Sequence, residues 1–474
     1  MRKILILIII SLFISCQTIE NKNENPNIVL IVADDLGWTD VSYMGSKYYE
    51  TPNIDKLSRS GMTFYNGYAS AANCAPSRAT MLSGRYNTHH GIYTVGASER
   101  GSETTRRIIP ISNENILDLR YFLIPEMLKN EGYVTGHFGK WHLGSQGFYP
   151  EDNGYDINIG GFEKGSPMGG YYSPYKNPKL DDGPKGEYLT DRLTDESIKL
   201  IKSHNKNQPF ALFLSFYNVH TPIQANEKHI KYFNKKISEM ADNEVRTKSE
   251  GDAITRLNHT NPEYASMVYA VDENVGKLIK SLKDSDLYEN SLIIFTSDNG
   301  GLSTLKRIAP TSVYPLRAGK GWLYEGGIRI PQLIKSPGNT ENVIVNDITA
   351  SYDLFPTILD FAGIKNNIDI DGISLAPILN GQSEIDREDI FWHFPHYHGS
   401  LWKPGSAIRS GDWKLVFHYE SNNAELYNLK EDPGELNDLS LLFEERKQIL
   451  LKKLNNLKNE TNANKVSINP NFKN

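Results

Sequence analysis

Three long apolar runs predict strands that are buried on both faces of a sheet. They cover residues 27–32, 209–217 and 291–296, and each is rich in Val, Ile, Leu or Phe. Continuous apolar runs of this length are typical of parallel strands that helices cover on both sides. Two further strands are expected at 62–68 and 133–138. The pattern therefore predicts an α/β protein with a large, mixed but mostly parallel sheet.

Segments with a helical period separate these strands. The clearest is 263–283, whose apolar residues form one stripe of the predicted helix, namely Val268, Val271, Val275, Leu278, Ile279 and Leu282. This stripe suits packing against the sheet and not a cofactor site. Shorter helices are expected at 51–61, 122–130, 190–204 and 351–361. The sheet should therefore be sandwiched by helices.

The pattern changes after about residue 387. Four short runs then predict antiparallel strands, at 390–394, 406–409, 414–419 and 425–429. Residues 445–457 predict a closing helix. We therefore expect a main domain at 27–386 and a smaller C-terminal α+β subdomain at 387–474.

The start of the chain has the pattern of an export signal. A basic start precedes the apolar stretch 4–14, which is too short to span a bilayer comfortably. The following Ser-Cys pair, which ends at Cys16, resembles a bacterial lipobox. We expect a lipoprotein signal at 1–15, lipidation of Cys16 and a flexible polar tether at 16–26. An ordinary secretory signal peptide is the alternative, and both predict an exported protein of the cell envelope.

Composition and charge narrow the class of protein. Of the 474 residues, 39% are hydrophobic and 23% are charged, which suits a folded globular body. The formal net charge is −6, so the chain is a poor candidate for binding nucleic acid. An anionic substrate would have to be received by local basic groups. The only cysteine outside the export signal is Cys74, so no disulfide is expected.

Polar oxygen ligands follow two of the buried strands. Asp34 and Asp35 come after the first strand, and Asp298 and Asn299 come after the third. Two buried carboxylates are costly unless they are paired or bind a metal, and ligands of open α/β sheets bind at this edge. Aspartates that only cap loops are the alternative. A set made of carboxylate and amide oxygens favours a hard divalent cation, Ca²⁺ before Mg²⁺.

Cys74 is expected at the N-terminus of a helix. Pro76 suits the first turn of that helix, and Arg78 lies one turn after the cysteine. Free N–H groups and positive charge at such a place favour an anion. The alternative for a lone cysteine is a buried small hydrophobic residue.

Four segments together resemble one enzyme family. The run from Cys74 to Arg85 (CAPSRATMLSGR) closely resembles the signature of the type I sulfatases, in the alkaline phosphatase superfamily. Further matching segments are 139–144 (GKWHLG), 218–222 (NVHTP) and 315–329. The resemblance extends from about residue 27 into the C-terminal region, and it implies an alkaline phosphatase-like fold and a sulfuric ester hydrolase.

The resemblance also implies roles for individual residues. A maturation enzyme would oxidise Cys74 to formylglycine, whose hydrate attacks the sulfur of a sulfate ester. The metal ligands would be Asp34, Asp35, Asp298 and Asn299, together with the group made from Cys74. Arg78, Lys140 and Lys320 would surround the charge of the sulfate. His220 would protonate the leaving sugar oxygen, and His142 would be the base that releases sulfate. Lys140 and His142 alternate with bulky residues, so an extended segment would point both to one face.

The leaving group is expected to be a carbohydrate. Residues 391–403 mix aromatic, His and Lys residues, a mixture that suits stacking on sugars and contacts with anions. His396, Trp402 and Lys403 are the candidate sugar contacts, with ordinary packing as the alternative. The substrate would be a sulfated polysaccharide or its oligomers, such as ulvan, carrageenan or a glycosaminoglycan.

Two other functions remain open at this point. A phosphoester or phosphonate hydrolase of the same superfamily is one. Such enzymes often use Ser or Thr as the nucleophile and more His metal ligands, whereas Cys74 here lies in a formylglycine-type signature. A surface lipoprotein that binds glycans without catalysis is the other, but all the candidate site residues are present.

Overall fold

The computed structural model describes residues 25–97, 99–205, 208–339, 341–365, 367–382 and 385–473. The expected signal at 1–15, the lipidation site Cys16 and most of the tether at 16–26 lie outside the described residues, so they stay predictions. In the part that is described, no helix is long and apolar enough to cross a membrane.

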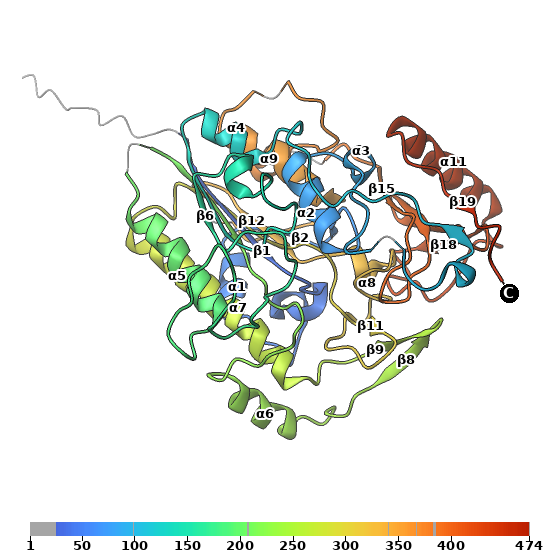
Figure 1. Cartoon of the computed structure of the whole chain (residues 1–474), viewed down its shortest axis with the longest axis horizontal. Coiled ribbons are helices and arrows are strands. Elements are labelled where there is room, and N and C mark those ends of the chain that lie inside the picture. Colours follow the sequence, from blue (N-terminus) through green and yellow to red (C-terminus); the bar gives the residue numbers. More distant parts are fainter. Residues whose placement is uncertain are drawn as a thin grey trace, which may run out of the picture.

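A large mixed sheet forms the centre of the molecule (Figure 1). Its strand order is β13-β2-β12-β10-β1-β7-β5-β6, and only β12 runs against both of its neighbours. In that order, the strands are Val343–Val345, Met62–Phe64, Gln332–Lys335, Ser291–Ser297, Asn27–Ala33, Phe210–Ser215, Val134–Gly139 and Ile157–Ile159. The mostly parallel sheet expected from the apolar runs is confirmed.

Helices cover both faces of this sheet, because its central strands are buried on both sides. Val29 and Ile31 of β1 point into one core and Leu30 into the other. The first core is covered by α1 (Pro52–Ser58), α5 (Leu189–Lys202) and α7 (Pro262–Asp284). The second is covered by α2 (Cys74–Ser83), α4 (Ile124–Asn130) and α9 (Leu354–Phe361). The sandwich of helices and sheet is therefore confirmed.

The longest helix shows why the sequence pattern works. Asn261 caps α7, because its side chain accepts hydrogen bonds from the backbone N–H groups of Glu263 and Tyr264. Pro262 occupies the first turn, where its missing N–H costs nothing. The apolar stripe from Val268 to Leu282 packs against the sheet. Burial of each such side chain stabilises the fold by about 1.5–3 kcal/mol.

The strand expected at 62–68 is two strands in the structure. The first is β2 of the large sheet, and the second, β3 (Gly67–Tyr68), pairs with β14 (Thr349–Ala350) in a separate sheet. Asn66 lies at the turn between them, where its side-chain amide donates to the carbonyl of Asn346. A single apolar run did not reveal this turn.

The C-terminal part contains a four-stranded antiparallel sheet and a long helix. The strands are β15 (Asp389–Phe394), β16 (Gly405–Ser410), β17 (Trp413–His418) and β18 (Asn423–Asn428), in sequence order. Helix α11 (Glu444–Glu460) packs its leucines against this sheet. Both the strands and the closing helix agree with the sequence pattern, while the boundary at residue 387 stays a prediction.

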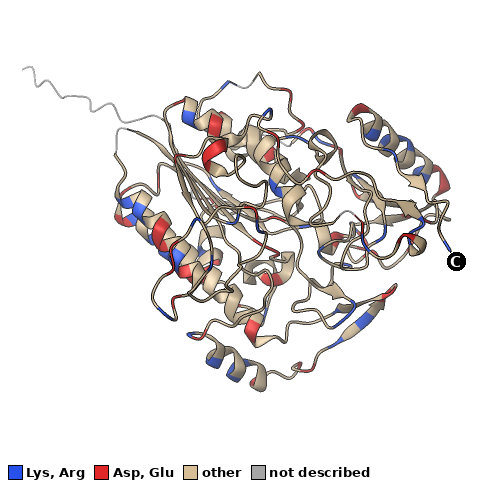
Figure 2. Ribbon diagram, in the orientation of Figure 1, with Lys and Arg blue, Asp and Glu red and all other residues tan. Residues whose placement is uncertain are grey.

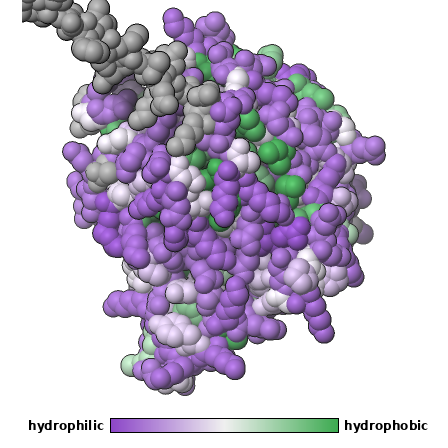
Figure 3. Space-filling view, turned by 90° about the vertical axis from the view of Figure 1, so that its left-hand side faces the viewer, coloured by the Kyte–Doolittle hydropathy of each residue, from purple (hydrophilic) through white to green (hydrophobic). Residues whose placement is uncertain are grey.

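Charged residues lie mainly on the outside of the molecule. Acidic and basic residues are interspersed along α5, α7 and α11 (Figure 2). The face shown in Figure 3 is largely hydrophilic, and most of the hydrophobic residues visible on it lie on its upper half. The apolar side chains of the sequence are therefore concentrated in the cores on either side of the sheet.

Candidate active site

Four neighbouring parallel strands, β5, β7, β1 and β10, end at one edge of the sheet. Ala33 of β1 pairs with Ser297 of β10, so the segments that follow these two strands leave the sheet side by side. The strand ends bring together six predicted site residues, Asp34, Asp35, Lys140, His220, Asp298 and Asn299. The edge predicted from the sequence is therefore where these residues meet.

Close approach of the chain at this edge requires glycine. Gly139, the last residue of β5, has φ +104°. A Cβ at this position would lie 2.0 Å from the carbonyl oxygen of Ser215 on β7. Only glycine lets the two strands stay paired here, and the next residue, Lys140, is thereby directed into the site.

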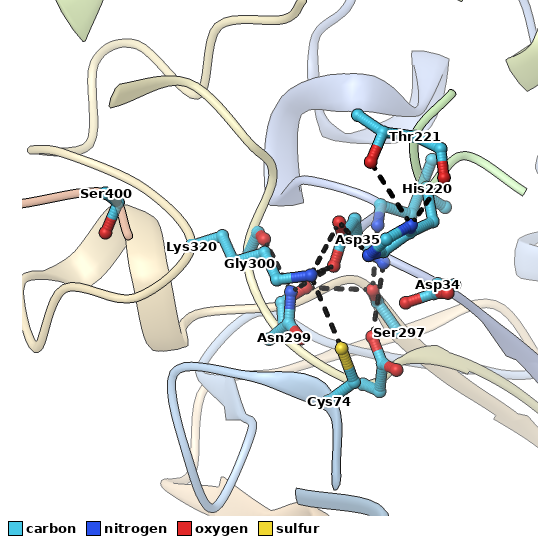
Figure 4. A network of polar contacts seen from close by, with 12 residues as sticks. Asp34, Asp35, Cys74, His220, Thr221, Ser297, Asn299, Gly300, Lys320 and Ser400 are labelled. Atoms are coloured by element: carbon cyan, nitrogen blue, oxygen red, sulfur yellow. Dashed lines mark hydrogen bonds and ion pairs between the residues drawn. The ribbon is translucent and has the colours of Figure 1, made fainter. Parts of the chain in front are cut away.

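Asp34, Asp35, Asp298 and Asn299 form one buried cluster. Figure 4 labels Asp34, Asp35 and Asn299 of this cluster. The side-chain amide of Asn299 donates to Oδ1 of Asp35 at 2.8 Å. The backbone N–H of Asp35 donates to Oδ1 of Asp298 at 3.2 Å. Among the described residues, Oδ1 of Asp34 and Oδ1 of Asn299 have no hydrogen-bond partner although both are buried. Since buried oxygens are rarely left unpaired, these two fit a bound cation.

Cys74 lies next to this cluster, at the start of α2 as expected. Its sulfur is within 4.8 Å of ligand atoms of Asp34 and Asp298, and also of ligand atoms of Asp35 and His220. Burial raises the pKa of the thiol above its ordinary value, although Lys140 and Lys320 act against this. An unmodified Cys74 is therefore a neutral thiol and a poor nucleophile.

Three basic side chains pair with the three carboxylates. Lys140 Nζ lies 2.7 Å from Asp34, and Lys320 Nζ lies 2.6 Å from Asp35. Arg78 Nε lies 2.8 Å from Asp298. With all three carboxylates ionised, as a bound cation would hold them, the three positive and three negative charges cancel, and a divalent cation would leave this group with two positive charges. Such a site is suited to an anionic substrate.

These pairs keep Asp35, Asp298 and Lys320 ionised, whereas burial, acting against the charge of Lys140, raises the pKa of Asp34 well above its ordinary value. Burial raises the pKa of Asp35, but Lys320 and His220 outweigh burial, and its pKa lies below the ordinary value. Burial also raises the pKa of Asp298, but the opposing charges, chiefly that of Arg78, outweigh burial, and the pKa lies below its ordinary value. Burial acts against the charge of Lys320, but Asp35 raises its pKa above the ordinary value. Lys320 is therefore a permanent positive charge of the site.

His220 lies at the mouth of the site and is partly exposed. Its Nδ1 is 2.8 Å from the carbonyl oxygen of Thr221, and its Nε2 is 3.8 Å from Asp35. Burial, with Lys320 next, lowers the pKa of His220 to about 4. The ring nitrogen Nε2 is thus the one that faces the reacting groups.

His142 reaches the site by a different route from the one expected. It has φ +64°, which is left-handed backbone and not a strand. The extended segment ends at Gly139, so alternation along a strand does not place Lys140 and His142 on one face; that part of the prediction is wrong. The backbone N–H of His142 donates to Phe162 at 3.1 Å. Burial, with Lys140 and Arg78 next, lowers the pKa of this histidine well below its ordinary value.

The predicted sugar contacts are not arranged for that role. His396 and Trp402 are 0% and 1% exposed, so a sugar could not stack on either. Nε2 of His396 lies 2.8 Å from the carbonyl of Ile111, and Trp402 packs on Trp322. Lys403 is exposed but pairs with Glu420 at 3.3 Å. For His396 and Trp402 the prediction is corrected to packing of the C-terminal sheet.

An open cleft of about 620 Å³ leads to Asp35, His220 and Lys320. Its walls include His398 and Ser400, which belong to the same mixed segment as His396 and Trp402. The segment predicted from the sequence therefore does line this cleft, but through His398 and Ser400 and not through His396 or Trp402. The other lining residues come from loops that show no pattern along the chain.

Comparison with known proteins agrees with this geometry. The model of the sulfatase family matches residues 26–364, and that of the C-terminal region of N-sulphoglucosamine sulphohydrolase matches residues 318–463. A sulfatase of Formosa agariphila is 34% identical, over 91% of this chain and 88% of the relative. Human N-acetylgalactosamine-6-sulfatase is 31% identical, over 78% of this chain and 68% of the relative.

A solved structure extends the likeness to three dimensions. Ps i-CgsB in complex with k-i-k-neocarrahexaose has a TM-score of 0.73 and 28% identity, and covers 91% of this chain and 92% of that one. The family match spans more than half of the chain and includes every residue of the buried cluster. The chain therefore belongs to the sulfatase family and is a sulfuric ester hydrolase.

Proposed function

We propose that this sulfatase hydrolyses sulfate esters of a sulfated polysaccharide or of its oligosaccharides, using a formylglycine made from Cys74. The observation that carries the proposal is the position of Cys74, buried at the start of α2 and 3.3 Å from the ammonium of Lys320. The sulfatase family in general uses formylglycine and a divalent metal. Cys74 is the one cysteine among the described residues, so the modification has a single candidate there.

We infer that Ca²⁺ is the cation, with Mg²⁺ as the less favoured choice. Asp34, Asp35, Asp298 and Asn299 would hold it, together with the group made from Cys74. Ca²⁺ accepts several oxygen ligands in flexible geometry, whereas Mg²⁺ retains waters and needs a regular octahedron. Together, the cation and the formylglycine hydrate would supply charge neutralisation and the nucleophilic hydroxyl.

The remaining site residues have roles that follow from their charge and position. Arg78, Lys140 and Lys320 carry fixed positive charge around Cys74, where the sulfate would lie. Groups placed in advance where negative charge develops are usually the largest source of catalysis. His220 lies at the open side of the site, where the sugar oxygen would leave, and is our candidate acid. This role requires the protonated ring, and therefore a higher pKa in the complex with cation and substrate than the value of about 4 without them. His142 is the candidate base on the enclosed side.

The substrate class is supported by two relatives. Ps i-CgsB is known in complex with k-i-k-neocarrahexaose, and the human relative is N-acetylgalactosamine-6-sulfatase. Both names refer to sulfated carbohydrates, one from carrageenan and one an amino sugar. The open cleft beside Asp35 has room for sugar units next to the scissile sulfate. We therefore propose an algal glycan or a glycosaminoglycan as the substrate.

Export is part of the proposal and rests on the sequence alone. The basic start, the apolar stretch and Cys16 favour a lipoprotein held at the outer membrane or in the periplasm. Such a protein would meet polymeric glycans outside the cytoplasm. Its partners would be the glycan, a formylglycine-generating enzyme and the membrane, through the lipid on Cys16.

The alternative remains a phosphoester or phosphonate hydrolase of the same superfamily. Curated relatives that are at least 30% identical carry the name sulfatase. The described cluster has three carboxylates and one amide, with His220 as the nearest histidine, and not a His-rich set for two metals. Both features favour sulfate esters.

The proposal is tested by peptide mass spectrometry of Cys74 from the native host, paired with sulfate release from a panel of sulfated glycans. We expect the mass change of a thiol converted to an aldehyde, and sulfate release that Cys74→Ala abolishes. Ser83→Ala is the matched control, because Ser83 is buried in the same helix away from the cluster. An unmodified thiol in active protein would overturn the formylglycine assignment. The modification without sulfate release from any glycan would overturn the substrate class.

A further inference from the structure

Three segments that are far apart in the sequence form the walls of the cleft beside the active site. They are the loop that contains Val95 and Arg100, the segment from Leu302 to Arg307, and the segment from His398 to Ser400. Asp35, His220 and Lys320 also line the cleft. A sugar whose sulfate reaches Cys74 would therefore lie between these three segments.

The walls of this cleft carry an excess of positive charge. Arg100, Lys306 and Arg307 line it in addition to Lys320, whereas Asp35 is the only acidic one among the described residues that line it. Asp35 is already paired with Lys320 at 2.6 Å. No ion pair joins Arg100, Lys306 or Arg307 to a carboxylate of the described residues. The chain as a whole has a net charge of −6, so this concentration of basic groups is local.

Arg100 is held with its guanidinium against the cleft. Its Nη2 donates to the carbonyl oxygen of Val95 at 3.1 Å. Its Nη1 lies against Gly399, where a Cβ would be only 3.0 Å away. The side chain of Arg106 supports the same loop, because its Nη1 donates to the carbonyl of Gly101 at 2.9 Å. Arg100 thus has a fixed position and N–H donors that are not used in an ion pair.

The wall that contains Lys306 and Arg307 is held by a small sheet. Strand β11 (Thr304–Leu305) pairs with β9 (Ala253–Arg256), which pairs with β8 (Thr247–Glu250). The hydroxyls of Thr304 and Thr255 lie 2.8 Å apart in the interior of this sheet. Lys306 and Arg307 follow β11 directly and are exposed. The two basic walls therefore face the same cleft from supports that are separate in the fold.

We propose that these walls bind a second anionic group of the sugar chain that carries the scissile sulfate. The group is a further sulfate ester or a carboxylate, and Arg100 and Arg307 determine the specificity for it. A guanidinium binds either anion with charge-assisted and often bidentate hydrogen bonds. The substrate is then a polyanionic oligosaccharide and not a singly charged ester. This inference rests on the proposed function, since it places the scissile sulfate at Cys74.

The test compares Arg100→Ala, Arg307→Ala and the double variant on three substrates. One is a sulfated disaccharide with no other charge, the second carries another sulfate, and the third carries a uronate carboxylate. We expect kcat/KM to fall on the order of tenfold or more for each variant, mainly through KM, on the doubly charged substrate whose second anion the walls bind. The loss on the singly charged substrate should be several-fold smaller. The second and third substrates distinguish a sulfate from a carboxylate as the bound group.

Two controls accompany this comparison. Arg59→Ala removes an exposed arginine that follows α1 and does not line the cleft. It should leave kcat/KM unchanged on all three substrates. Raising the salt concentration should weaken turnover of the doubly charged substrates more than that of the singly charged one. Thermal unfolding of each variant checks that the fold is retained.

An equal loss on all three substrates, or no loss on any, overturns the inference. Calorimetric binding of the same three sugars to Cys74→Ala protein keeps the test independent of turnover. If the wild-type protein releases no sulfate but Arg100 and Arg307 still select the doubly charged sugars, the proposed function is overturned and the inferred anion binding is supported. If sulfate is released without that selection, the proposed function is supported and the inferred anion binding by Arg100 and Arg307 is overturned.

Discussion

The ammonium nitrogen of Lys320 lies 3.3 Å from the sulfur of Cys74. The same nitrogen lies 2.6 Å from Asp35, a predicted metal ligand. Lys320 follows a glycine in a loop that is far from Cys74 in the sequence, and its own backbone N–H donates to Gly301 at 2.9 Å. One side chain thus contacts both Cys74 and the buried carboxylate cluster.

Removal of that charge should affect the chemical step. We expect Lys320→Met to lower kcat by about 100- to 1,000-fold, the usual loss when one fixed group that stabilises developing charge is removed. Lys320→Arg should retain part of the activity, because it keeps the charge. The measurement is sulfate release under saturating substrate.

Lys280→Ala is the control for this change. Lys280 is an exposed lysine of α7 that pairs with the exposed Asp284 one turn away, so activity should not change. If Lys320→Met changed only KM and left kcat intact, Lys320 would bind the substrate without stabilising the reaction.

Removal of the cation should abolish activity and lower stability. Asp34, Asp35 and Asp298 are buried together, and a ligand that binds only the folded state stabilises it, by about 2.7 kcal/mol at a concentration 100 times Kd. We expect a chelator to lower Tm and Ca²⁺ to restore Tm and activity better than Mg²⁺. Thermal unfolding and sulfate release under the same conditions provide the measurement. Full activity in the chelated protein would contradict the metal assignment.

Several parts of the site could be predicted because each lies directly after a long apolar run. Asp34 and Asp298 follow strands whose residues point into both cores, and the sheet then brings the strand ends together. Cys74 could be placed because Pro76 and the residues after it suit a helix start. These patterns can be recognised locally in the sequence, and the parallel sheet then brings the residues together.

Other parts could not be predicted because they depend on tertiary contacts. His142 takes left-handed backbone to follow the loop at Phe162, which no alternation pattern reveals. Trp402 looks like a sugar-stacking residue in the sequence, but the C-terminal sheet buries it on Trp322. Strands such as β12 and β13 have only four and three residues, too few for a clear period. The cleft wall with Arg100 has no signal at all along the chain.

The junction with the C-terminal sheet should make stability depend on pH. Lys414 of β17 lies 3.0 Å from Glu325 and 2.8 Å from Glu435, and all three are buried. Burial raises the pKa of Glu435 to about 7 from an ordinary value of 4.5, because the opposing charge of Lys414 does not offset burial and the repulsion from Glu325. The folded protein therefore holds this proton more tightly than the unfolded chain. Stability is then greatest below about pH 4.5 for this group and falls as the pH rises through about 7.

Glu435→Gln should remove this dependence. We expect its free energy of unfolding to change less between pH 5 and pH 8 than that of the wild type, by on the order of 2 kcal/mol. Urea unfolding at the two pH values is the measurement. Glu444→Gln is the control, because Glu444 is exposed at the start of α11. If the free energy of unfolding changed equally in the wild type and the variant between pH 5 and pH 8, the assignment to Glu435 would be contradicted.

The close approach of β5 and β7 can be tested with two glycines that differ in one respect. Gly139 and Gly132 both have positive φ, +104° and +84°, so alanine is strained at each. A Cβ at Gly139 would lie 2.0 Å from the carbonyl of Ser215, whereas nothing lies within 4 Å of one at Gly132. Backbone strain alone costs about 1–3 kcal/mol. We expect Gly132→Ala to lose about that amount and to keep its activity.

Gly139→Ala should lose clearly more stability and most of its activity, because β5 must move away from β7 and take Lys140 with it. Lys140 would then no longer reach Asp34, which it now contacts at 2.7 Å. Urea unfolding and sulfate release of both variants provide the measurement. Equal losses in the two variants would mean that backbone conformation, and not the contact with Ser215, is what requires glycine at the end of β5.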